Sequence, residues 1–336
     1  MITAELAGRH RESWQYELAE AITDPGQLLE ALALDPALLT PALAAAARFR
    51  LRVPRSFVAR MRRGDAHDPL LRQVLPIGEE LIDAEGYSGD PLGESAANRA
   101  PGLLHKYRGR ALLVTTGACA VHCRYCFRRE FPYEAQVSEG GRWAGALMAI
   151  RADTSIEEII LSGGDPLSLS NARLTALTGS LAAIPHLRRL RVHTRTPVVL
   201  PSRVDDGFVA WLRTLPWPAV VVVHTNHARE IDNAVTGAFT RIRATGVQLL
   251  NQSVLLAGVN DDEEALVALS GALFDAGALP YYLHLLDRVR GASHFAVPEA
   301  RGRELMRAIS ARLPGYLVPR LALEEAGAAG KTVLGD

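Results

Sequence analysis

Lysine and cysteine are both scarce in this chain of 336 residues. Of its 37 basic residues only Lys106 and Lys331 are lysines, so chemistry that needs a side-chain amine must use one of these two. An excess of charge is also lacking, because 37 acidic residues balance the basic ones. Without a net charge there is no strong field to attract nucleic acid or an anionic membrane, and we expect neither as a partner.

Long apolar segments and targeting signals are missing as well. Purely apolar runs such as residues 219–223 are far too short to span a bilayer. The first residues show no basic flank followed by an apolar core, so no secretory signal is visible. Since 48% of the residues are hydrophobic and 22% are charged, we predict a folded protein with a sizeable core, located in the cytoplasm.

Two patterns divide the chain near residue 100. Before it, helix formers concentrate at 27–34 and 43–49, and Asp-Pro pairs at 24–25 and 35–36 predict helix starts or turns. After it, short apolar runs alternate with helical segments. We predict six strands, at 111–116, 156–162, 187–194, 219–225, 248–256 and 279–286.

Alternation of strands and helices predicts a parallel sheet covered by helices. Six units are too few for a closed barrel of eight. We therefore expect an α/β fold, a partial (β/α)6 barrel with its chemistry at the C-terminal ends of the strands. The predicted organisation is a helical extension over 1–100, the barrel over 101–300, and a C-terminal segment over 301–336.

The three cysteines, Cys119, Cys123 and Cys126, lie within eight residues and follow the first predicted strand. Such a cluster does not resemble a disulfide framework, and the second pair of a structural zinc site is missing, although His122 could serve as a fourth ligand. Three thiolates suit a [4Fe–4S] cluster that leaves one iron without a protein ligand. We predict that these cysteines hold such a cluster.

This C-x3-C-x2-C loop resembles that of the radical S-adenosylmethionine (SAM) enzymes, in which the open iron binds SAM and the cluster cleaves it reductively. Residues 163–165, Gly-Gly-Asp, resemble the superfamily's Gly-Gly-Glu element, with Asp in place of Glu, although a plain glycine-rich turn is the alternative. The resemblance implies that Gly163, Gly164 and Asp165 bind SAM and that Tyr125 lies near its adenine. His224 and Gln252, at the ends of the fourth and fifth predicted strands, could each be an ordinary polar residue of the barrel mouth. Together they supply hydrogen-bonding groups around one cavity, and we predict that they bind a cofactor.

From about residue 68 to 334 the chain resembles the lysine 2,3-aminomutase family of radical SAM enzymes. The matching motifs are DPLLRQ at 68–73, HKYRGR at 105–110, CFRR at 126–129, RTPVVLP at 195–201, NQSVLL at 251–256 and GVND at 258–261. Members of this family are isomerases that use pyridoxal phosphate (PLP). The resemblance implies that Lys331 binds PLP as a Schiff base, that Lys106 and Arg110 bind its phosphate, and that Tyr107 lies close to it.

Composition alone leaves Lys331 open, because a lysine near the end of a chain is often only solvated. Gly-Lys-Thr at 330–332 does not form a P-loop, since the required earlier glycine would fall at position 325, which is Glu.

The resemblance also implies how L-lysine would be bound. Arg128 matches the arginine that binds the α-carboxylate, a task suited to its planar guanidinium. Asp287 and Glu324 match two acids that bind the side-chain ammonium, although the family has Asp where this chain has Glu324. Either acid could instead pair with one of the many arginines. The implied reaction moves the amino group from Cα to Cβ after the deoxyadenosyl radical removes a β-hydrogen.

Within the family the chain is most similar to the shorter branch that makes (R)-β-lysine for elongation factor P. It ends five residues after Lys331, whereas catabolic members continue into a zinc-binding extension. The resemblance implies two further partners, an electron donor and a lysyl-tRNA-synthetase-like ligase that acts on elongation factor P. The alternatives are an aminomutase that acts on free lysine or another amino acid in metabolism, and a cluster protein that does not use PLP.

Overall fold

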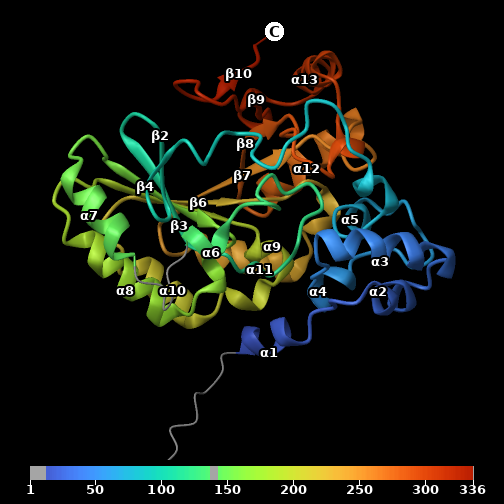
Figure 1. Cartoon of the computed structure of the whole chain (residues 1–336), viewed down its shortest axis with the longest axis horizontal. Coiled ribbons are helices and arrows are strands. Elements are labelled where there is room, and N and C mark those ends of the chain that lie inside the picture. Colours follow the sequence, from blue (N-terminus) through green and yellow to red (C-terminus); the bar gives the residue numbers. More distant parts are fainter. Residues whose placement is uncertain (1–12, 137–142, 336) are drawn as a thin grey trace, which may run out of the picture.

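The computed structural model describes residues 13–136 and 143–335, and a ten-stranded sheet in chain order forms its centre (Figure 1). Consecutive strands from β3 to β9 pair in parallel. They are β3 (Arg110–Thr116), β4 (Glu158–Gly163), β5 (Arg189–Thr194), β6 (Ala219–Val223), β7 (Gln248–Val254), β8 (Leu279–His284) and β9 (Arg320–Leu323). Antiparallel strands complete the edges: β1 (Asn98–Ala100) and β2 (Leu103–Tyr107) on one side, β10 (Thr332–Val333) on the other.

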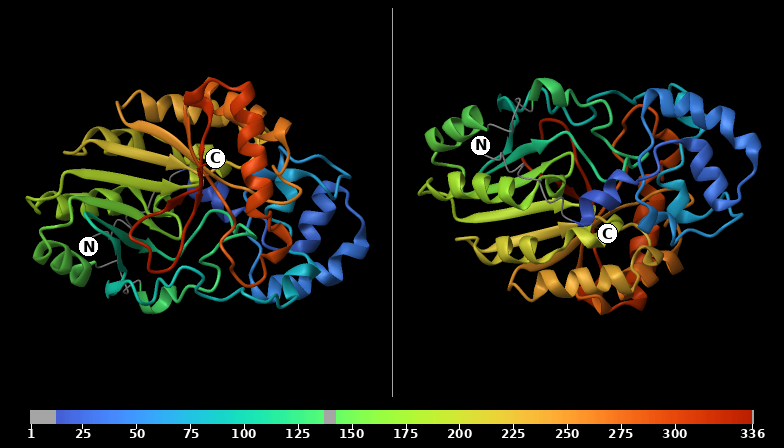
Figure 2. Two further views of the ribbon diagram at one scale, coloured as in Figure 1. Left: turned by 90° about the horizontal axis from the view of Figure 1, so that it is seen from above. Right: turned by 90° about the horizontal axis from the view of Figure 1, so that it is seen from below.

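Helices cover the convex face of this curved sheet (Figure 2). They are α7 (Ala144–Ala152), α8 (Asn171–Ala182), α10 (Asp206–Arg213), α11 (Asn233–Arg243), α12 (Glu263–Asp275) and α13 (Glu299–Arg312). Four of them begin after a side chain that accepts a hydrogen bond from the first helical turn, namely Ser170, Asp205, Asp232 and Asp262. Such N-caps satisfy backbone donors that a helix start leaves unpaired, so local sequence defines where each crossover begins.

The six predicted strands and the partial barrel are confirmed, because β3 to β8 match the predicted ranges and the sheet is open. A seventh parallel strand, β9, was not predicted. Its four residues are too short to show a period, and the two residues of β10 lie in a tail rich in glycine and alanine. The tail returns antiparallel along β9, with Thr332 opposite Leu323.

Short helices occupy the N-terminal part of the chain: α1 (Ser13–Ala19), α2 (Pro25–Leu32), α3 (Leu39–Arg48), α4 (Arg55–Val58) and α5 (Pro69–Arg72). Asp24 and Asp35 cap the helical turns that follow them, as the Asp-Pro pairs predict. The apolar core of these helices continues into Val121 of the cysteine loop and Val199 of helix α9 (Thr196–Val199). The helices therefore support the loop that carries the cysteines.

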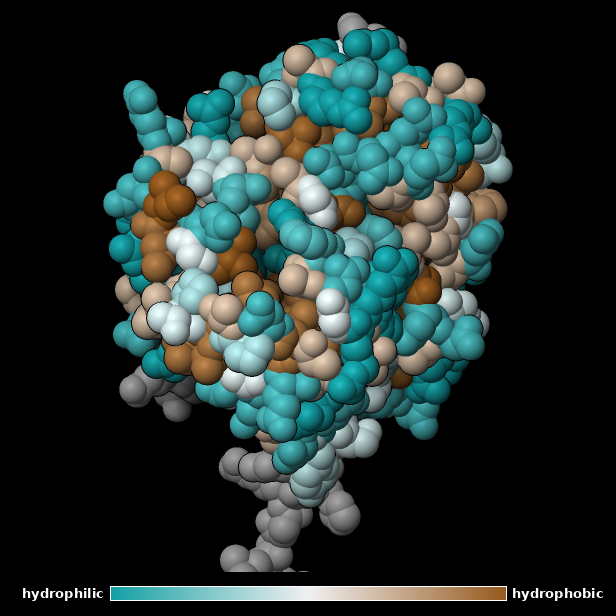
Figure 3. Space-filling view, turned by 90° about the vertical axis from the view of Figure 1, so that its right-hand side faces the viewer, coloured by the Kyte–Doolittle hydropathy of each residue, from teal (hydrophilic) through white to brown (hydrophobic). Residues whose placement is uncertain are grey.

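Figure 3 shows the side of the molecule to which these helices contribute, and hydrophobic and hydrophilic residues are interspersed over it. None of the helices in the described part of the chain has the length and hydropathy needed to cross a membrane.

A buried carboxylate joins the N-terminal helices to the cysteine loop. Glu80, in the 3-10 helix Gly78–Leu81, accepts hydrogen bonds from Arg124 Nε at 2.7 Å and from Arg129 Nη2 at 2.7 Å. The side chains of Glu80 and Arg124 are 1% and 0% exposed. Both arginines belong to the segment that carries Cys123 and Cys126, so Glu80 fixes the position of that segment.

We expect Glu80→Gln to lower the free energy of unfolding by about 3–5 kcal/mol, because two buried guanidinium groups would lose their counter-charge. Urea denaturation of the cofactor-free protein measures this change. Glu79→Gln is the matched control, since Glu79 is exposed, and we expect its effect to stay within about 0.5 kcal/mol. Equal stabilities of the two variants would contradict this role of Glu80.

Candidate functional site

The cysteine loop leaves the C-terminal end of β3 and lies directly against the end of β4. Gly164 N donates to Thr116 O at 2.7 Å, and Asp165 N donates to Ala118 O at 2.8 Å. A Cβ atom on Gly164 would lie 2.4 Å from Ala118 O, and Gly163 has a φ of 116°. Only glycine allows this close approach and this conformation without strain. The glycine pair therefore positions the loop that precedes Cys119.

The three thiols lie close enough to influence one another's ionisation. Burial, the charge of Asp165 and the neighbouring sulfurs raise the pKa of Cys119 well above its usual value, and burial together with Cys123 raises the pKa of Cys126 to about 11. Cys126 N donates to Cys123 O at 3.0 Å, which closes a tight turn between two of the sulfurs.

Among the described residues, no three His, Cys, Asp or Glu side chains converge closely enough to hold a single metal ion. A [4Fe–4S] cluster makes a different demand, because each cysteine binds a separate iron of the cube. Three neighbouring thiols on one loop fit that demand.

Asp165 uses its carboxylate within the protein. It accepts hydrogen bonds from Leu167 N at 2.9 Å, Thr194 Oγ1 at 2.7 Å, Arg195 N at 2.7 Å and Thr196 N at 3.0 Å. Four bonds fill the lone-pair positions of a carboxylate. In this conformation Asp165 fixes the backbone after β5, and its contact with SAM stays a prediction.

Tyr125 lies between the cysteine loop and the ends of β5 and β6. Its hydroxyl accepts hydrogen bonds from Arg195 Nη1 and, at 2.7 Å, from Asn226 Nδ2. The same Arg195 nitrogen donates to Cys123 Sγ at 2.9 Å. The predicted adenine contact of Tyr125 is not tested by this arrangement, which instead places the tyrosine in a network around one cysteine.

Lys331 and Glu324 are brought together by the hairpin of β9 and β10. The register pairs Leu323 with Thr332, so Glu324 and Lys331, the next residues toward the turn, face each other across the hairpin. Lys331 Nζ donates to Glu324 Oε2 at 2.7 Å and lies 5.8 Å from the centre of the Tyr282 ring. The side chain of Lys331 is only 21% exposed, which differs from the solvated tail lysine that composition left open.

The other lysine binds the same carboxylate. Lys106 Nζ lies 3.2 Å from Glu324 Oε1 and 3.5 Å from Glu94 Oε1. Glu94 in turn holds Arg128, accepting from Nε and Nη2 at 2.7 Å each. We call the series Arg128, Glu94, Lys106, Glu324 and Lys331 the charge chain, because cations and anions alternate along it.

The Arg128 end of the charge chain opens into a cavity of about 380 Å³. Phe127, Phe131 and Gln136 also line this cavity. Arg128 Nη1 donates to Ser162 Oγ at 3.1 Å and approaches Gly163 O at 3.4 Å. Arg128 is therefore held by β4 as well as by Glu94.

The two acids predicted to bind an ammonium differ in charge state. Burial alone would raise the pKa of Glu324, but Lys331 and Lys106 lower it to about 2. Burial and the negative charge of Glu324 raise the pKa of Asp287 to about 7. Glu324 is thus a firm anion, whereas Asp287 titrates near neutral pH.

Three histidines of this region have a buried ring nitrogen. His193, His224 and His284 each have an Nε2 atom without a hydrogen-bond partner. Burial and the charge of Lys331 lower the pKa of all three, that of His224 to about 3. These imidazoles are neutral, and each offers a free hydrogen-bonding nitrogen to a ligand.

The remaining predicted residues lie near this region with fewer contacts. Arg110 stacks 4.7 Å from the centre of the Tyr107 ring, and no carboxylate of the described residues lies within 4.0 Å of its guanidinium. Burial and Glu324 raise the pKa of Tyr107. Gln252 on β7 pairs with Tyr282 on β8.

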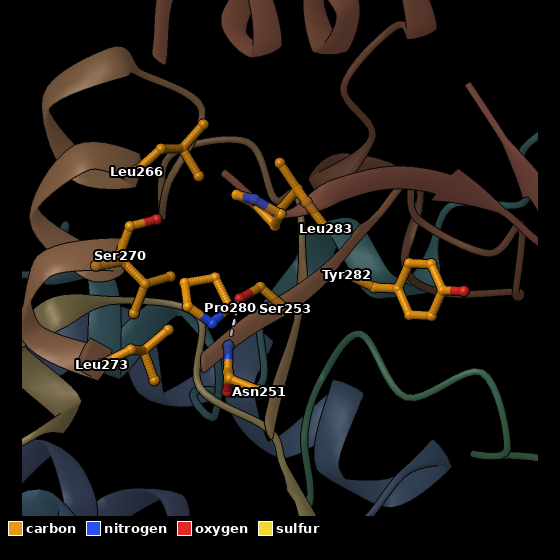
Figure 4. Close-up of a pocket in the computed structure, with 10 residues that line it drawn as sticks. Asn251, Ser253, Leu266, Ser270, Leu273, Pro280, Tyr282 and Leu283 are labelled. Atoms are coloured by element: carbon orange, nitrogen blue, oxygen red, sulfur yellow. Dashed lines mark hydrogen bonds between the residues drawn. The ribbon is translucent and has the colours of Figure 1, made fainter. Parts of the chain in front are cut away.

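The opposite face of β7 and β8 is packed core. Figure 4 shows Asn251 and Ser253 on the side of α12, while the ring of Tyr282 points away from that helix. The cavity between α12 and these strands measures about 10 Å³, which is barely room for one water molecule. The side toward which Tyr282 points is therefore the one that can accept a ligand.

Two residues of this region were not predicted. Glu94 lies in a polar connection with no local pattern, and only its three-dimensional contacts identify it. Arg195 belongs to a motif shared with the family, RTPVVLP, which is a signal that could identify it, but no pattern in the sequence indicates that it lies beside Cys123.

Comparison with known proteins agrees with the sequence resemblance. The L-lysine 2,3-aminomutase of Escherichia coli (strain K12) is 47% identical over 325 residues, 96% of this chain and 95% of that protein. The enzyme of the same name from Haemophilus influenzae is 46% identical over 98% and 97% of the two chains. No family model matches the chain. Among solved structures, a radical SAM methyltransferase from Sphaerobacter thermophilus is similar at a TM-score of 0.47, with 19% identity over 66% of this chain and 68% of that one.

We expect the contribution of Asp287 to the stability of the cofactor-free protein to fall as the pH rises from about 4 to about 7, because folding raises the pKa of Asp287 from 3.8 to about 7. In that window the folded protein binds a proton that the unfolded chain has released. Asp287→Asn removes this effect, so at pH 8 the variant should be more stable than the wild type by up to about 4 kcal/mol, with no difference below about pH 4.

Urea denaturation at pH 4, 6 and 8 measures this difference. The control is Asp206→Asn, since the Asp206 side chain is 99% exposed and should leave the pH profile unchanged. Parallel profiles of the wild type and Asp287→Asn would contradict the prediction.

Proposed function

Because the chain belongs to the L-lysine 2,3-aminomutase family, we propose that it converts L-lysine to (R)-β-lysine in the cytoplasm. Members of this family are isomerases, and membership brings a [4Fe–4S] cluster and SAM as cofactors. The proposal adds PLP as a third cofactor and assigns the residues that bind each group. It also assigns the product to the modification of elongation factor P.

The charge chain is the observation that carries the proposal. L-Lysine has a carboxylate and an ammonium at one end and a second ammonium at the other. Arg128 offers a planar cation at one end of the charge chain, and Glu324 and Asp287 offer acids near its other end. Electrostatic complementarity of this kind fits a long amino acid with a cationic side chain, and would repel an acidic one.

The cysteine loop suits the cluster. Cys119, Cys123 and Cys126 influence one another's pKa, and three ligands for four irons leave one iron for SAM. When bound, the reduced cluster supplies one electron to SAM and so generates the deoxyadenosyl radical. The protein would hold SAM with Tyr125, Gly163, Gly164, Asp165, His224 and Gln252. His224 has a free buried nitrogen for this purpose, whereas Asp165 would act mainly through the backbone that it holds.

PLP suits the other end of the site. Lys331 offers the amine, Arg110 offers a guanidinium that no described carboxylate neutralises, and Lys106 binds the same carboxylate as Lys331. When bound, PLP supplies a conjugated ring that can delocalise a radical. Attachment to Lys331 requires the Lys331–Glu324 ion pair to break, which frees one oxygen of Glu324 for the side-chain ammonium of the substrate.

Arg128 would bind the substrate α-carboxylate through Nη1. Its Nε and Nη2 are held by Glu94, and the contacts of Nη1 with Ser162 and Gly163 are longer, at 3.1 and 3.4 Å. Glu94 thus fixes the plane of the guanidinium while leaving its weakest-held nitrogen for the ligand.

The role in elongation factor P modification rests on the sequence resemblance to the shorter branch of the family. In this proposal an electron donor reduces the cluster, and a lysyl-tRNA-synthetase-like ligase attaches the (R)-β-lysine to elongation factor P. The competing proposal is an aminomutase whose product enters metabolism directly.

We expect Lys331→Ala to abolish the visible absorbance of lysine-bound PLP and all β-lysine formation, while the absorbance of the cluster remains. Borohydride reduction followed by peptide mass spectrometry should locate the pyridoxyl group on Lys331 in the wild type. Lys106→Ala is the matched control, since it removes the only other lysine and should weaken PLP binding without preventing attachment. A pyridoxyl group on Lys106 would reverse the assignment.

We expect the anaerobically reconstituted, reduced protein with SAM, PLP and L-lysine to form (R)-β-lysine, measured by chiral chromatography. Addition of the ligase and elongation factor P should then give the β-lysylated factor, detected by intact mass. The (S) isomer would contradict the elongation factor role and support the metabolic alternative. No β-lysine from protein loaded with cluster and PLP would contradict the assignment of Arg128, Asp287 and Glu324.

A further inference from the structure

One arginine of the described chain donates a hydrogen bond to a cysteine. Arg195 follows β5, its side chain is 5% exposed, and its Nη1 lies 2.9 Å from Cys123 Sγ. The three arginines of the cysteine loop itself bind carboxylates, because Glu80 accepts from Arg124 and Arg129 and Glu94 accepts from Arg128. The contact between Arg195 and Cys123 is therefore specific to one guanidinium and one sulfur.

Surrounding groups hold this guanidinium in place. Its Nη2 donates to Gln73 Oε1 at 2.7 Å and to Glu230 Oε2 at 3.1 Å. Glu230 is itself fixed, since its other oxygen accepts from the backbone nitrogens of Asn226 at 2.9 Å and His227 at 3.0 Å. Because Gln73 and Glu230 hold Nη2, the guanidinium of Arg195 keeps its Nη1 directed at Cys123.

We propose that Arg195 is a positioning residue that raises the reduction potential of the cluster through its hydrogen bond to Cys123. The inference rests on the proposed cluster ligands. Reduction adds one electron to the [4Fe–4S] core, from the +2 to the +1 state, and the added negative charge is shared with the cysteine sulfurs. A cation and a hydrogen bond on one sulfur stabilise the reduced state more than the oxidised state.

Burial strengthens the effect of Arg195 on the reduction potential. Arg195 and Glu230 are 5% and 0% exposed at their side chains, so water and salt screen the field of the guanidinium only weakly. Glu230 offsets part of the positive charge from the side opposite the sulfur. The two residues should therefore shift the potential in opposite directions, a pattern that general damage to the fold would not produce.

The test is a redox titration of the reconstituted full-length protein without SAM, with the reduced cluster followed by electron paramagnetic resonance. Titanium(III) citrate is the one-electron reductant. We expect Arg195→Gln to lower the equilibrium constant for reduction at least tenfold, which is about 59 mV for a one-electron couple. Arg195→Lys keeps the charge and should restore part of the shift, and Glu230→Gln should raise the potential.

Arg60→Gln is the control variant. Arg60 is also largely buried near Glu230 but donates to the carbonyl oxygens of Ser56, Val198 and Glu230 rather than to a cysteine. We expect a much smaller shift of the potential than in Arg195→Gln, because Arg60 donates no hydrogen bond to a cysteine sulfur.

Iron and sulfide content separates failure of this inference from failure of the proposed function. A wild type that assembles no cluster would overturn both. An intact cluster whose potential is the same in wild type and Arg195→Gln would overturn the inference alone, and weaker SAM binding in that variant would assign the guanidinium to the cosubstrate instead. If Arg195→Gln assembles no cluster, Arg195→Lys and Glu230→Gln decide, and shifts of the same sign in both would contradict the proposal.

Discussion

A carboxylate joins the two edges of a sheet that does not close through backbone hydrogen bonds. Lys106 lies on β2 near one edge, and Glu324 follows β9 near the other, with 3.2 Å between Nζ and Oε1. Lys331 binds the second oxygen of the same carboxylate at 2.7 Å. These side chains are 16–21% exposed, so solvent screens their attraction only in part. The positions of both lysines therefore depend on Glu324.

The same carboxylate determines the charge of its neighbours. Two lysines keep Glu324 ionised, and its negative charge then discourages ionisation of Asp287. Two acids near one another behave in this way whenever only one is neutralised by cations. A bound ammonium between them would favour the ionised form of both, so the site gains a second negative charge when a cationic ligand arrives. The histidines nearby stay neutral and do not oppose it.

The sequence predicts the repeated features of the fold but not its edges. Strands such as Ala219–Val223 are apolar runs flanked by helices with clear caps, and both signals are local. The edge strands have two to five residues, and each pairs with the strand next to it in the chain. Segments this short show no clear alternation of apolar and polar residues, so a period cannot indicate them.

The residues of the site likewise fall into two groups, those that the sequence indicates and those that it does not. The cysteines and Lys331 stand out because their residue types are rare in the chain, and rarity is visible in one dimension. Glu94 and Arg195 are common residue types whose importance comes from contacts 34 and 72 positions away. The family resemblance assigns roles only to residues that match known functional residues of the family. It does not indicate that a carboxylate, Glu94, binds Arg128.

Arg128 connects the cysteine loop to the charge chain. It lies two residues after Cys126, it contacts Ser162 and Gly163 at the strand end that holds the cysteine loop, and through Glu94 it begins the charge chain that ends at Lys331. A radical must form close to the bond that it attacks, and binding energy is useful only if it fixes that distance. A carboxylate bound at Arg128 would be held by the side chain that β4 and Glu94 fix. In the proposed site, the positions of the substrate and the cluster would then depend on one rigid element of the protein.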